Sequence, residues 1–243
     1  MRIIKVDNYN ALSKRAADII AAQVLLKPSC VLGLATGATP EGTYQELVRR
    51  HKEEGLSFSE VKTVNLDEYK GLSKDSNQSY YYYMNQHLFS HVDISKENTH
   101  LPDGLAEDAQ AECEAYEQLM NRLGGIDLQL LGIGRNGHIG FNEPDESFTN
   151  VTHTVALTQS TIDANAKYFE NEDKMPRFAF TMGIGSIMRA RKILLLANGN
   201  TKAQILKEAL TGPVTPKVPA SILQLHSDVT IVADPQALAL FDK

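Results

Sequence analysis

The middle of the chain holds an apolar run that breaks abruptly into glycines, within the stretch Leu130–Pro144, LLGIGRNGHIGFNEP. Glycines occupy positions 132, 134, 137 and 140. Because glycine carries no β-carbon, it lets the backbone adopt positive φ and approach a ligand closely. Ligands of open α/β sheets bind just beyond the carboxyl ends of the strands. The stretch therefore predicts a buried strand that ends at a ligand site.

Three polar side chains in this bend could carry chemistry: Asn136, His138 and Glu143. An imidazole titrates near neutral pH, and a nearby carboxylate can orient it for proton transfer. The alternative is a tight turn with a polar rim, which is common for a single Gly-His pair. The run of glycines and polar groups directly behind an apolar strand favours the functional interpretation.

Elsewhere, short apolar runs alternate with segments of helical periodicity, which is the pattern of a parallel sheet with crossover helices. The predicted strands are residues 2–6, 30–35, 61–66, 128–133, 178–182, 192–197 and 229–233, with 151–157 as an edge strand. The predicted helices include residues 9–26, 79–89, 108–123 and 160–168, with others that begin near residues 39 and 202. We therefore predict an α/β fold in which residues 1–243 form one domain. It contains a single doubly wound, mostly parallel sheet with helices on both faces.

A second turn of small residues follows the predicted strand 30–35, and it reads Thr36, Gly37, Ala38, Thr39. Thr39 is expected to cap a helix whose first residue is Pro40. Backbone N–H groups and the helix dipole at such a start bind phosphate. The turn matches neither a nucleoside-triphosphate loop nor a dinucleotide fingerprint, so it favours a single phosphate on a small molecule. An ordinary βα turn is the open alternative.

Two further strand ends carry charged residues. Asp67 and Glu68 follow strand 61–66, and Lys202 follows strand 192–197 at the start of a helix. A lysine in the first helical turn is unfavourable to the helix dipole unless an anion is bound nearby. The alternative is that these residues are ordinary solvated charges on the protein surface, without a role in binding or catalysis. Because the carboxyl ends of parallel strands share one edge, these groups together indicate acid–base chemistry on a small phosphorylated metabolite.

The composition argues against several other classes of function. A net charge of −6 is unlike the basic face that nucleic-acid binding requires. Cys30 and Cys113 lie outside any CxxC motif, and His87 and His91 lack a third ligand, so we expect no disulfide and no metal. No cofactor fingerprint is present. The first residues do not resemble a signal peptide and no apolar run has the length of a membrane span, so we expect a cytoplasmic protein without a membrane partner.

Four segments together resemble glucosamine-6-phosphate deaminases, a family of glucosamine- and galactosamine-6-phosphate isomerases. They are Leu32–Tyr44, Val64–Leu72, Gly132–Pro144 and Leu223–Val229, which span nearly the whole chain in order. The GHIGFNEP segment is specific to that family, whereas the surrounding fold is shared more widely. The resemblance implies the cofactor-free conversion of glucosamine 6-phosphate and water to fructose 6-phosphate and ammonia, in amino-sugar catabolism.

The resemblance also implies roles for individual residues. His138 would open the sugar ring, with Glu143 and Asn136 orienting its imidazole. Asp67 would move a proton between C2 and C1. The residues that would hold the 6-phosphate are Thr36, Gly37, Ala38, Thr39, Lys167 and Lys202. A mobile lid is expected around residues 153–182, because that region includes the weakly apolar, charged stretch 170–177.

Two departures from relatives have consequences. Some members have Asp where this chain has Asn136, and a neutral amide cannot stabilise an imidazolium as a carboxylate can. Hexameric, allosterically activated relatives are longer at the C-terminus and basic just after the Glu-Pro turn, whereas residues 151–155 here contain neither Arg nor Lys. We therefore expect hyperbolic kinetics and a monomer or small homo-oligomer.

Two other functions compete with this interpretation. A 6-phosphogluconolactonase would have a similar Gly-His turn, but that family carries Asp-Glu-Arg where this chain has Asp67-Glu68-Tyr69, and it lacks the Phe-Asn-Glu-Pro ending. A non-catalytic domain that senses sugar phosphates would accompany a DNA-binding helix-turn-helix. It would also have no need to combine Asp67, His138 and Glu143.

Overall fold

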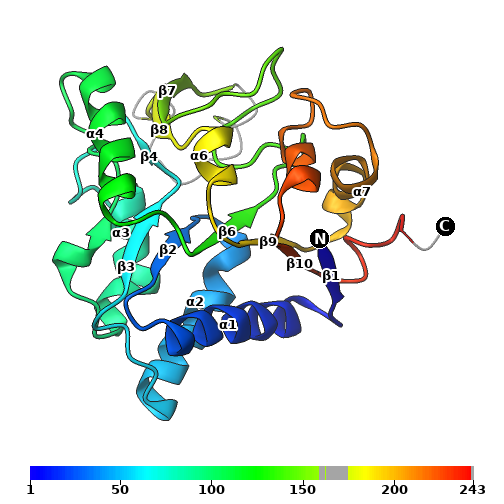
Figure 1. The fold of residues 1–243 in the computed structure, drawn as a ribbon, viewed down its shortest axis with the longest axis horizontal. Helices are drawn as coiled ribbons and strands as arrows, with labels where there is room; N and C mark the ends of the chain where they lie inside the picture. The colour runs from blue at the N-terminus through cyan, green and yellow to red at the C-terminus, as the bar shows by residue number, and fades with distance from the viewer. Residues whose placement is uncertain (159–161, 163–174, 242–243) are drawn as a thin grey trace.

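A seven-stranded parallel sheet forms the centre of the molecule (Figure 1). The structure is a computed structural model that describes residues 1–158, 162 and 175–241. The strands of the central sheet are β1 (Arg2–Lys5), β2 (Val31–Leu34), β3 (Lys62–Asn65), β5 (Thr99–His100), β6 (Leu128–Gly132), β9 (Ile193–Ala197) and β10 (Val229–Ala233). Their order is β1-β10-β9-β6-β2-β3-β5, and each neighbouring pair is parallel. β2, β9 and β10 are buried along their whole length, as expected for strands covered on both faces.

Helices cover both faces of this sheet. They are α1 (Tyr9–Leu26), α2 (Ala38–Glu54), α3 (Tyr80–His87), α4 (Ala109–Arg122), α6 (Ile184–Met188) and α7 (Ala203–Thr211). Short 3-10 helices lie at Phe89–His91, Lys96–Asn98, Asn200–Lys202 and Pro219–Leu225. α1 and α2 lie together on one side of the sheet, and α4 and α6 lie on the other (Figure 1). In α1 the buried residues Leu12, Ala16, Ile20 and Val24 recur every four positions, so one stripe of the helix faces the core.

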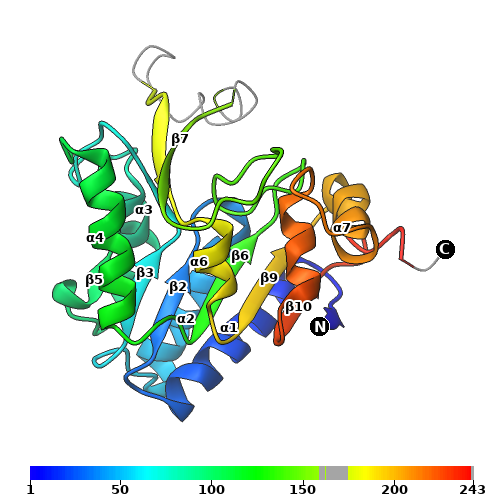
Figure 2. The ribbon, with the colours of Figure 1, turned by 45° about the horizontal axis from the view of Figure 1, so that its top comes forward.

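A second, antiparallel sheet stands on the edge where the central strands end. It consists of β4 (Asp67–Tyr69), β8 (Phe178–Thr181) and β7 (His153–Ala156), in the order β4-β8-β7. β4 begins two residues after β3, so the chain passes almost directly from one sheet into the other. Figure 2 shows β7 and the yellow strand β8 rising above the central sheet. A separate apolar cluster lies against this sheet, formed by Tyr69, Phe141, Leu157, Ile162, Met175 and Ala179.

The predicted fold class is confirmed, and two details differ from the expectation. The segments 151–157 and 178–182 were expected to belong to the main sheet, but they form two strands of the second sheet. Thr39 was expected to cap α2, but the helix begins at Ala38 and its cap position is Gly37, with φ of 97°. Positive φ at a glycine turns the chain sharply enough to start the helix earlier, so Thr39 lies in its first turn. The predicted helix 160–168, apart from Ile162, lies outside the described residues.

Candidate active site

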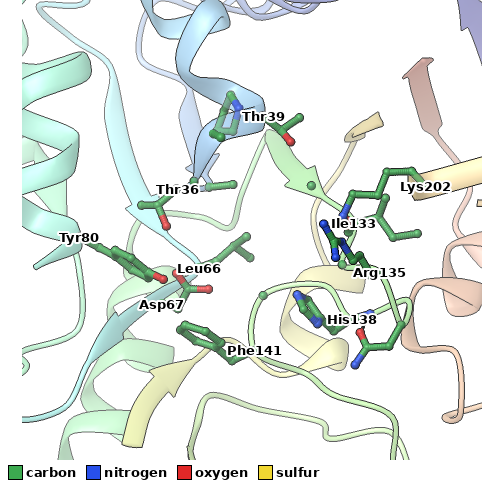
Figure 3. A pocket seen from close by; sticks show the side chains of 18 residues that line it. Thr36, Thr39, Leu66, Asp67, Tyr80, Ile133, Arg135, His138, Phe141 and Lys202 are labelled. Carbon is green, nitrogen blue, oxygen red and sulfur yellow. Dashed lines mark hydrogen bonds between the residues drawn. The ribbon is translucent and has the colours of Figure 1, made fainter. Parts of the chain in front are cut away.

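A cavity of about 720 Å³ opens at the carboxyl edge of the central sheet, beneath the second sheet. Its walls come from the turns after β2, β3 and β6, from the first residue of α3 and from the 3-10 turn before α7 (Figure 3). The lining residues are Ala35, Thr36, Gly37, Ala38, Thr39, Pro40, Leu66, Asp67, Tyr80, Gly132, Ile133, Gly134, Arg135, Asn136, His138, Gly140, Phe141 and Lys202. This is the position at which ligands of open α/β sheets bind.

The start of α2 forms one wall of the cavity. Among the described residues no side chain caps this helix, so its first N–H groups have no side-chain acceptor there. Two tyrosines fix the loop from behind: Tyr44 donates from Oη to the Ala35 carbonyl at 2.5 Å, and Tyr83 donates to the Gly37 carbonyl at 2.7 Å. An uncapped helix start that faces a cavity is suited to an anion.

Lys202 enters the same end of the cavity from the last residue of the 3-10 turn that follows β9. Its Nζ donates to the Ile133 carbonyl at 2.6 Å. Burial lowers the pKa of Lys202, and the positive charge of Arg135 lowers it further. Figure 3 shows Arg135 and Lys202 on the same side of the cavity, which the start of α2 also lines.

Asp67 lies on the opposite wall, as the first residue of β4 (Figure 3). Its side chain is almost enclosed, with the residue 6% exposed, and its carboxylate accepts no hydrogen bond from the described residues. Burial raises the pKa of Asp67 to about 8, and the adjacent charge of Glu68 contributes to the increase. A carboxyl group whose pKa lies near working pH can both take and return a proton.

Glu68 points away from the cavity and binds the start of α3. Its Oε1 accepts hydrogen bonds from the N–H groups of Tyr69 at 2.8 Å and Tyr80 at 2.9 Å, and its Oε2 accepts one from Tyr81 at 2.9 Å. Burial raises the pKa of Glu68 to about 7, although these three donors favour the charged form. The carboxylate thereby positions Tyr80, whose ring stacks on Phe141 and lines the cavity.

His138 lies on the wall opposite Asp67, in the bend after β6 (Figure 3). Its Nδ1 is 3.3 Å from Oε1 of Glu143, which is an ion-pair distance, although the atoms are not aligned for a hydrogen bond. Asn136 donates from Nδ2 to Oε2 of Glu143 at 2.5 Å and accepts from the His138 N–H at 3.3 Å. Glu143 therefore contacts the imidazole of His138, and Asn136 links Glu143 to the backbone of the same residue.

The structure brings together most of the residues that the sequence singled out. Those that line the cavity are Thr36, Gly37, Ala38, Thr39, Asp67, Asn136, His138 and Lys202. Glu143 is absent from the lining and contacts two residues that line the cavity, His138 and Asn136. Lys167 lies outside the described residues, as does most of the segment expected to form a lid.

Sequence reasoning missed one cavity residue entirely and treated another as packing. Arg135 stands between two residues that were noticed, and an arginine in a glycine-rich turn was the available signal. Tyr80 belongs to a run of four tyrosines, a pattern that indicates mainly packing with one hydroxyl able to reach the cleft. Within the described part of the chain, no three His, Cys, Asp or Glu side chains gather closely enough to hold a metal ion. No helix there is long and apolar enough to span a membrane.

Comparison with known proteins relates this chain to one family over nearly its whole length. The family described as glucosamine-6-phosphate isomerases/6-phosphogluconolactonase matches residues 6–232. Glucosamine-6-phosphate deaminase from Lachnoclostridium phytofermentans is 57% identical over 232 residues, which cover 96% of this chain and 98% of the relative. The corresponding protein of a Geobacillus strain is 57% identical over 240 residues, covering 99% and 96%.

Solved structures give the same relationship. A monomeric glucosamine-6-phosphate deaminase superposes with a TM-score of 0.96 at 50% identity, covering 99% of this chain and all of the other. A 6-phosphogluconolactonase from Trypanosoma cruzi superposes with a TM-score of 0.77 at 21% identity, covering 100% of this chain and 97% of the other. At that identity the second likeness shows a common fold alone.

Proposed function

The chain belongs to the family of glucosamine-6-phosphate isomerases and 6-phosphogluconolactonases, and we propose that it is a glucosamine-6-phosphate deaminase with Asp67 and His138 as its catalytic residues. It converts glucosamine 6-phosphate and water to fructose 6-phosphate and ammonia. The observation that carries the assignment of roles is the placement of an enclosed carboxylate and a histidine on facing walls of one cavity. The cavity also has an anion-binding end.

The substrate phosphate binds at that end, against the start of α2 and Lys202. Charge-assisted hydrogen bonds and the helix dipole both favour a phosphate there. The groups available to bind it include the backbone N–H groups of Gly37, Ala38 and Thr39, residues that all line the cavity. With the phosphate fixed, the sugar extends toward Asp67 and His138.

His138 opens the pyranose ring. It accepts the proton of the anomeric hydroxyl and delivers a proton to the ring oxygen as the C1–O5 bond breaks, which leaves an aldehyde at C1. Glu143 keeps the imidazole in place during both transfers through its contact with Nδ1, and Asn136 in turn holds the Glu143 carboxylate and the His138 N–H.

Asp67 then carries out the isomerisation. It removes the proton from C2 while O1 takes up a proton from water, which gives an enolamine, and it returns the proton to C1, which gives the protonated imine of a ketose. Water hydrolyses that imine to the ketone and releases ammonia. A single carboxylate on one face of the substrate can make both transfers, and its raised pKa matches a base that must also act as an acid.

A 6-phosphogluconolactonase would need no base that moves a proton between two carbons. The enclosed Asp67, with its carboxylate facing the cavity, favours the deaminase because a carboxyl group with a raised pKa is suited to that transfer. The lactonase neighbours are about one-fifth identical in sequence, and their likeness concerns the fold.

We further propose that residues 1–243 act as one catalytic domain, because the cavity draws its walls from both sheets. The absence of Arg and Lys from residues 151–155 supports a monomer or small assembly without allosteric activation. The reaction belongs to amino-sugar catabolism, including the use of N-acetylglucosamine. We also propose a cytoplasmic location without a nucleic-acid or membrane partner, and the net charge of −6 supports the lack of a nucleic-acid partner.

The experiment that tests this function compares ammonia release from glucosamine 6-phosphate by the wild type and by Asp67→Asn. Loss of a general base lowers turnover by about 10² to 10⁴. KM should change little, because the phosphate end of the cavity is untouched. Asp75→Asn, the same change at an exposed residue outside the cavity lining, serves as a control that should retain activity. Undiminished turnover by Asp67→Asn would remove Asp67 from this role.

A further inference from the structure

Arg135 lines the cavity, and its guanidinium lacks any partner in the described part of the chain. Among residues 1–158, 162 and 175–241, none makes an ion pair or a hydrogen bond with it. The residue is exposed rather than packed beneath other side chains. Figure 3 shows that Arg135 and Lys202 enter the cavity from the same side.

The backbone of the glycine-rich turn determines where Arg135 lies. The Gly137 N–H donates to the Gly134 carbonyl at 3.1 Å, and the Gly134 N–H donates to the His138 carbonyl at 2.9 Å. Gly137 has φ of 87°, and a β-carbon there would lie 2.9 Å from Cγ1 of Val218. The turn is therefore closed by hydrogen bonds and packed from behind, so Arg135 projects from a fixed position.

The charges at this end of the cavity are unbalanced. Arg135 and Lys202 both carry positive charge, and their proximity is one reason why the pKa of Lys202 is lowered. Asp67 is the acidic residue of the cavity lining and lies on the opposite wall. Two neighbouring cations without a counter-charge disfavour one another, and an anion bound between them removes that cost.

The two cations offer different hydrogen-bonding geometry. Lys202 already uses one of its donors on the Ile133 carbonyl, at 2.6 Å. Arginine presents five donors in a planar fork that matches two oxygens of a phosphate. The start of α2 supplies further donors across the same space.

We propose that Arg135 is a substrate-binding residue that holds the phosphate of the substrate together with Lys202 and the amides at the start of α2. The identity of the substrate rests on the proposed function, but the binding of a phosphate monoester does not. The turn that carries His138 then also binds the phosphate, so phosphate binding and the position of the ring-opening group depend on one rigid segment.

The test compares wild type, Arg135→Gln and Arg135→Lys, with Arg15→Gln as a control that removes the same charge from an exposed position on α1. Loss of a charge-assisted hydrogen bond should raise KM for glucosamine 6-phosphate about 10- to 100-fold in Arg135→Gln. Its kcat should stay within about threefold of wild type. Arg135→Lys should give an intermediate KM, and Arg15→Gln should match wild type.

Binding of inorganic phosphate, measured by calorimetry, provides a readout that does not depend on catalysis. Arg135→Gln should weaken the dissociation constant of phosphate by a similar factor. An unchanged constant, a fall in kcat without a rise in KM, or no phosphate binding to the wild type would each overturn the proposal. A wild type that binds phosphate but releases no ammonia from glucosamine 6-phosphate would reject the proposed function instead, while the phosphate measurement would still decide the role of Arg135.

Discussion

Asn136 lies so close to Glu143 that a carboxylate at position 136 would change the proton affinity of the Glu143 side chain. Its Nδ2 lies 2.5 Å from Oε2 of Glu143, so an aspartate there would bring two carboxylates to hydrogen-bond distance. Two such groups cannot both stay ionised without cost, so the substitution changes the proton equilibrium of the carboxylates beside His138. The sequence indicated that Asn or Asp at position 136 affects proton transfer through His138. The contact between Asn136 and Glu143 gives a second reason for the same effect.

Asn136→Asp should therefore move the acid limb of the activity–pH profile to higher pH. The measurement is kcat/KM for glucosamine 6-phosphate across pH 5 to 9, which reports the essential groups of the free enzyme. Asn121→Asp, an exposed change at the end of α4, controls for net charge. An unmoved limb would show that residue 136 does not affect the proton equilibrium of this cluster.

Ionisation of Asp67 also affects the stability of the folded protein. The direction of its pKa shift determines whether stability rises or falls with pH. Its pKa is raised from the ordinary value of 3.8 to about 8 in the folded protein. Because this pKa is raised, the protonated carboxyl favours the folded state. Its contribution to stability is fully present below about pH 3.8 and is lost as the pH rises through about 8. The neutral side chain of Asp67→Asn does not incur this loss.

The thermal stability of Asp67→Asn relative to wild type should therefore increase between about pH 4 and pH 8. The gain should reach roughly 1 to 3 kcal/mol, the usual range for single substitutions, with turnover lost at the same time. Melting temperatures of both proteins across this pH range measure the effect. The exposed Asp75→Asn should show no such trend. A constant difference between Asp67→Asn and wild type would contradict the account.

At the scale of the elements, Glu117 joins α4 to the base of the second sheet. Its Oε1 accepts from the Thr152 N–H at 2.8 Å, the Thr152 hydroxyl at 2.6 Å and the Ser186 hydroxyl at 2.5 Å. Its Oε2 accepts from Nη2 of Arg189 at 2.6 Å. Thr152 directly precedes β7, so this carboxylate fixes where the strand begins.

Glu117→Gln should loosen that junction, because a neutral amide cannot accept all four hydrogen bonds. We expect a loss of about 1 to 3 kcal/mol in the free energy of unfolding, measured by denaturant titration. Hydrogen exchange should accelerate at the amides of β7 and leave those of α1 unchanged. Glu114→Gln, on the same helix and bonded only to Gln110 among its described partners, is the matched control. Equal exchange rates in both variants would refute the role.

The elements of the central sheet could be predicted because each strand is a short apolar run and each long helix has a periodic apolar stripe. The second sheet could not be predicted in this way. β4 reads Asp-Glu-Tyr, which by composition resembles a loop, and its partner β8 is distant in sequence. Pairing of Asp67 with Thr181 depends on the folded arrangement of the whole chain.

The candidate site was predictable to the extent that its residues stand at strand ends. Asp67, His138 and Lys202 follow buried strands, and the topology of a parallel sheet brings such ends to one edge. Arg135 and Tyr80 enter the cavity through the shape of a turn and through the anchoring of α3 by Glu68. Neither of these causes is visible as a local pattern in the sequence.

At the scale of the whole molecule, we expect this enzyme to function without cooperativity between subunits. Residues 151–155 contain neither Arg nor Lys, so they offer no cation for an anionic effector. Initial rates should follow a hyperbola in glucosamine 6-phosphate, and light scattering should show a monomer or a small assembly. A sigmoidal curve relieved by N-acetylglucosamine 6-phosphate would contradict this expectation.

The close succession of β3 and β4 has a mechanical consequence. Asp67 pairs with Thr181 of β8, and β8 in turn pairs with β7. The proposed base therefore belongs to the same antiparallel ribbon as β7 and β8. Any tilt of that ribbon relative to the central sheet displaces the carboxylate from the sugar carbons. We therefore expect that any movement of the ribbon over the substrate also moves the proton acceptor, and that a covalent tether fixing the ribbon would stop both.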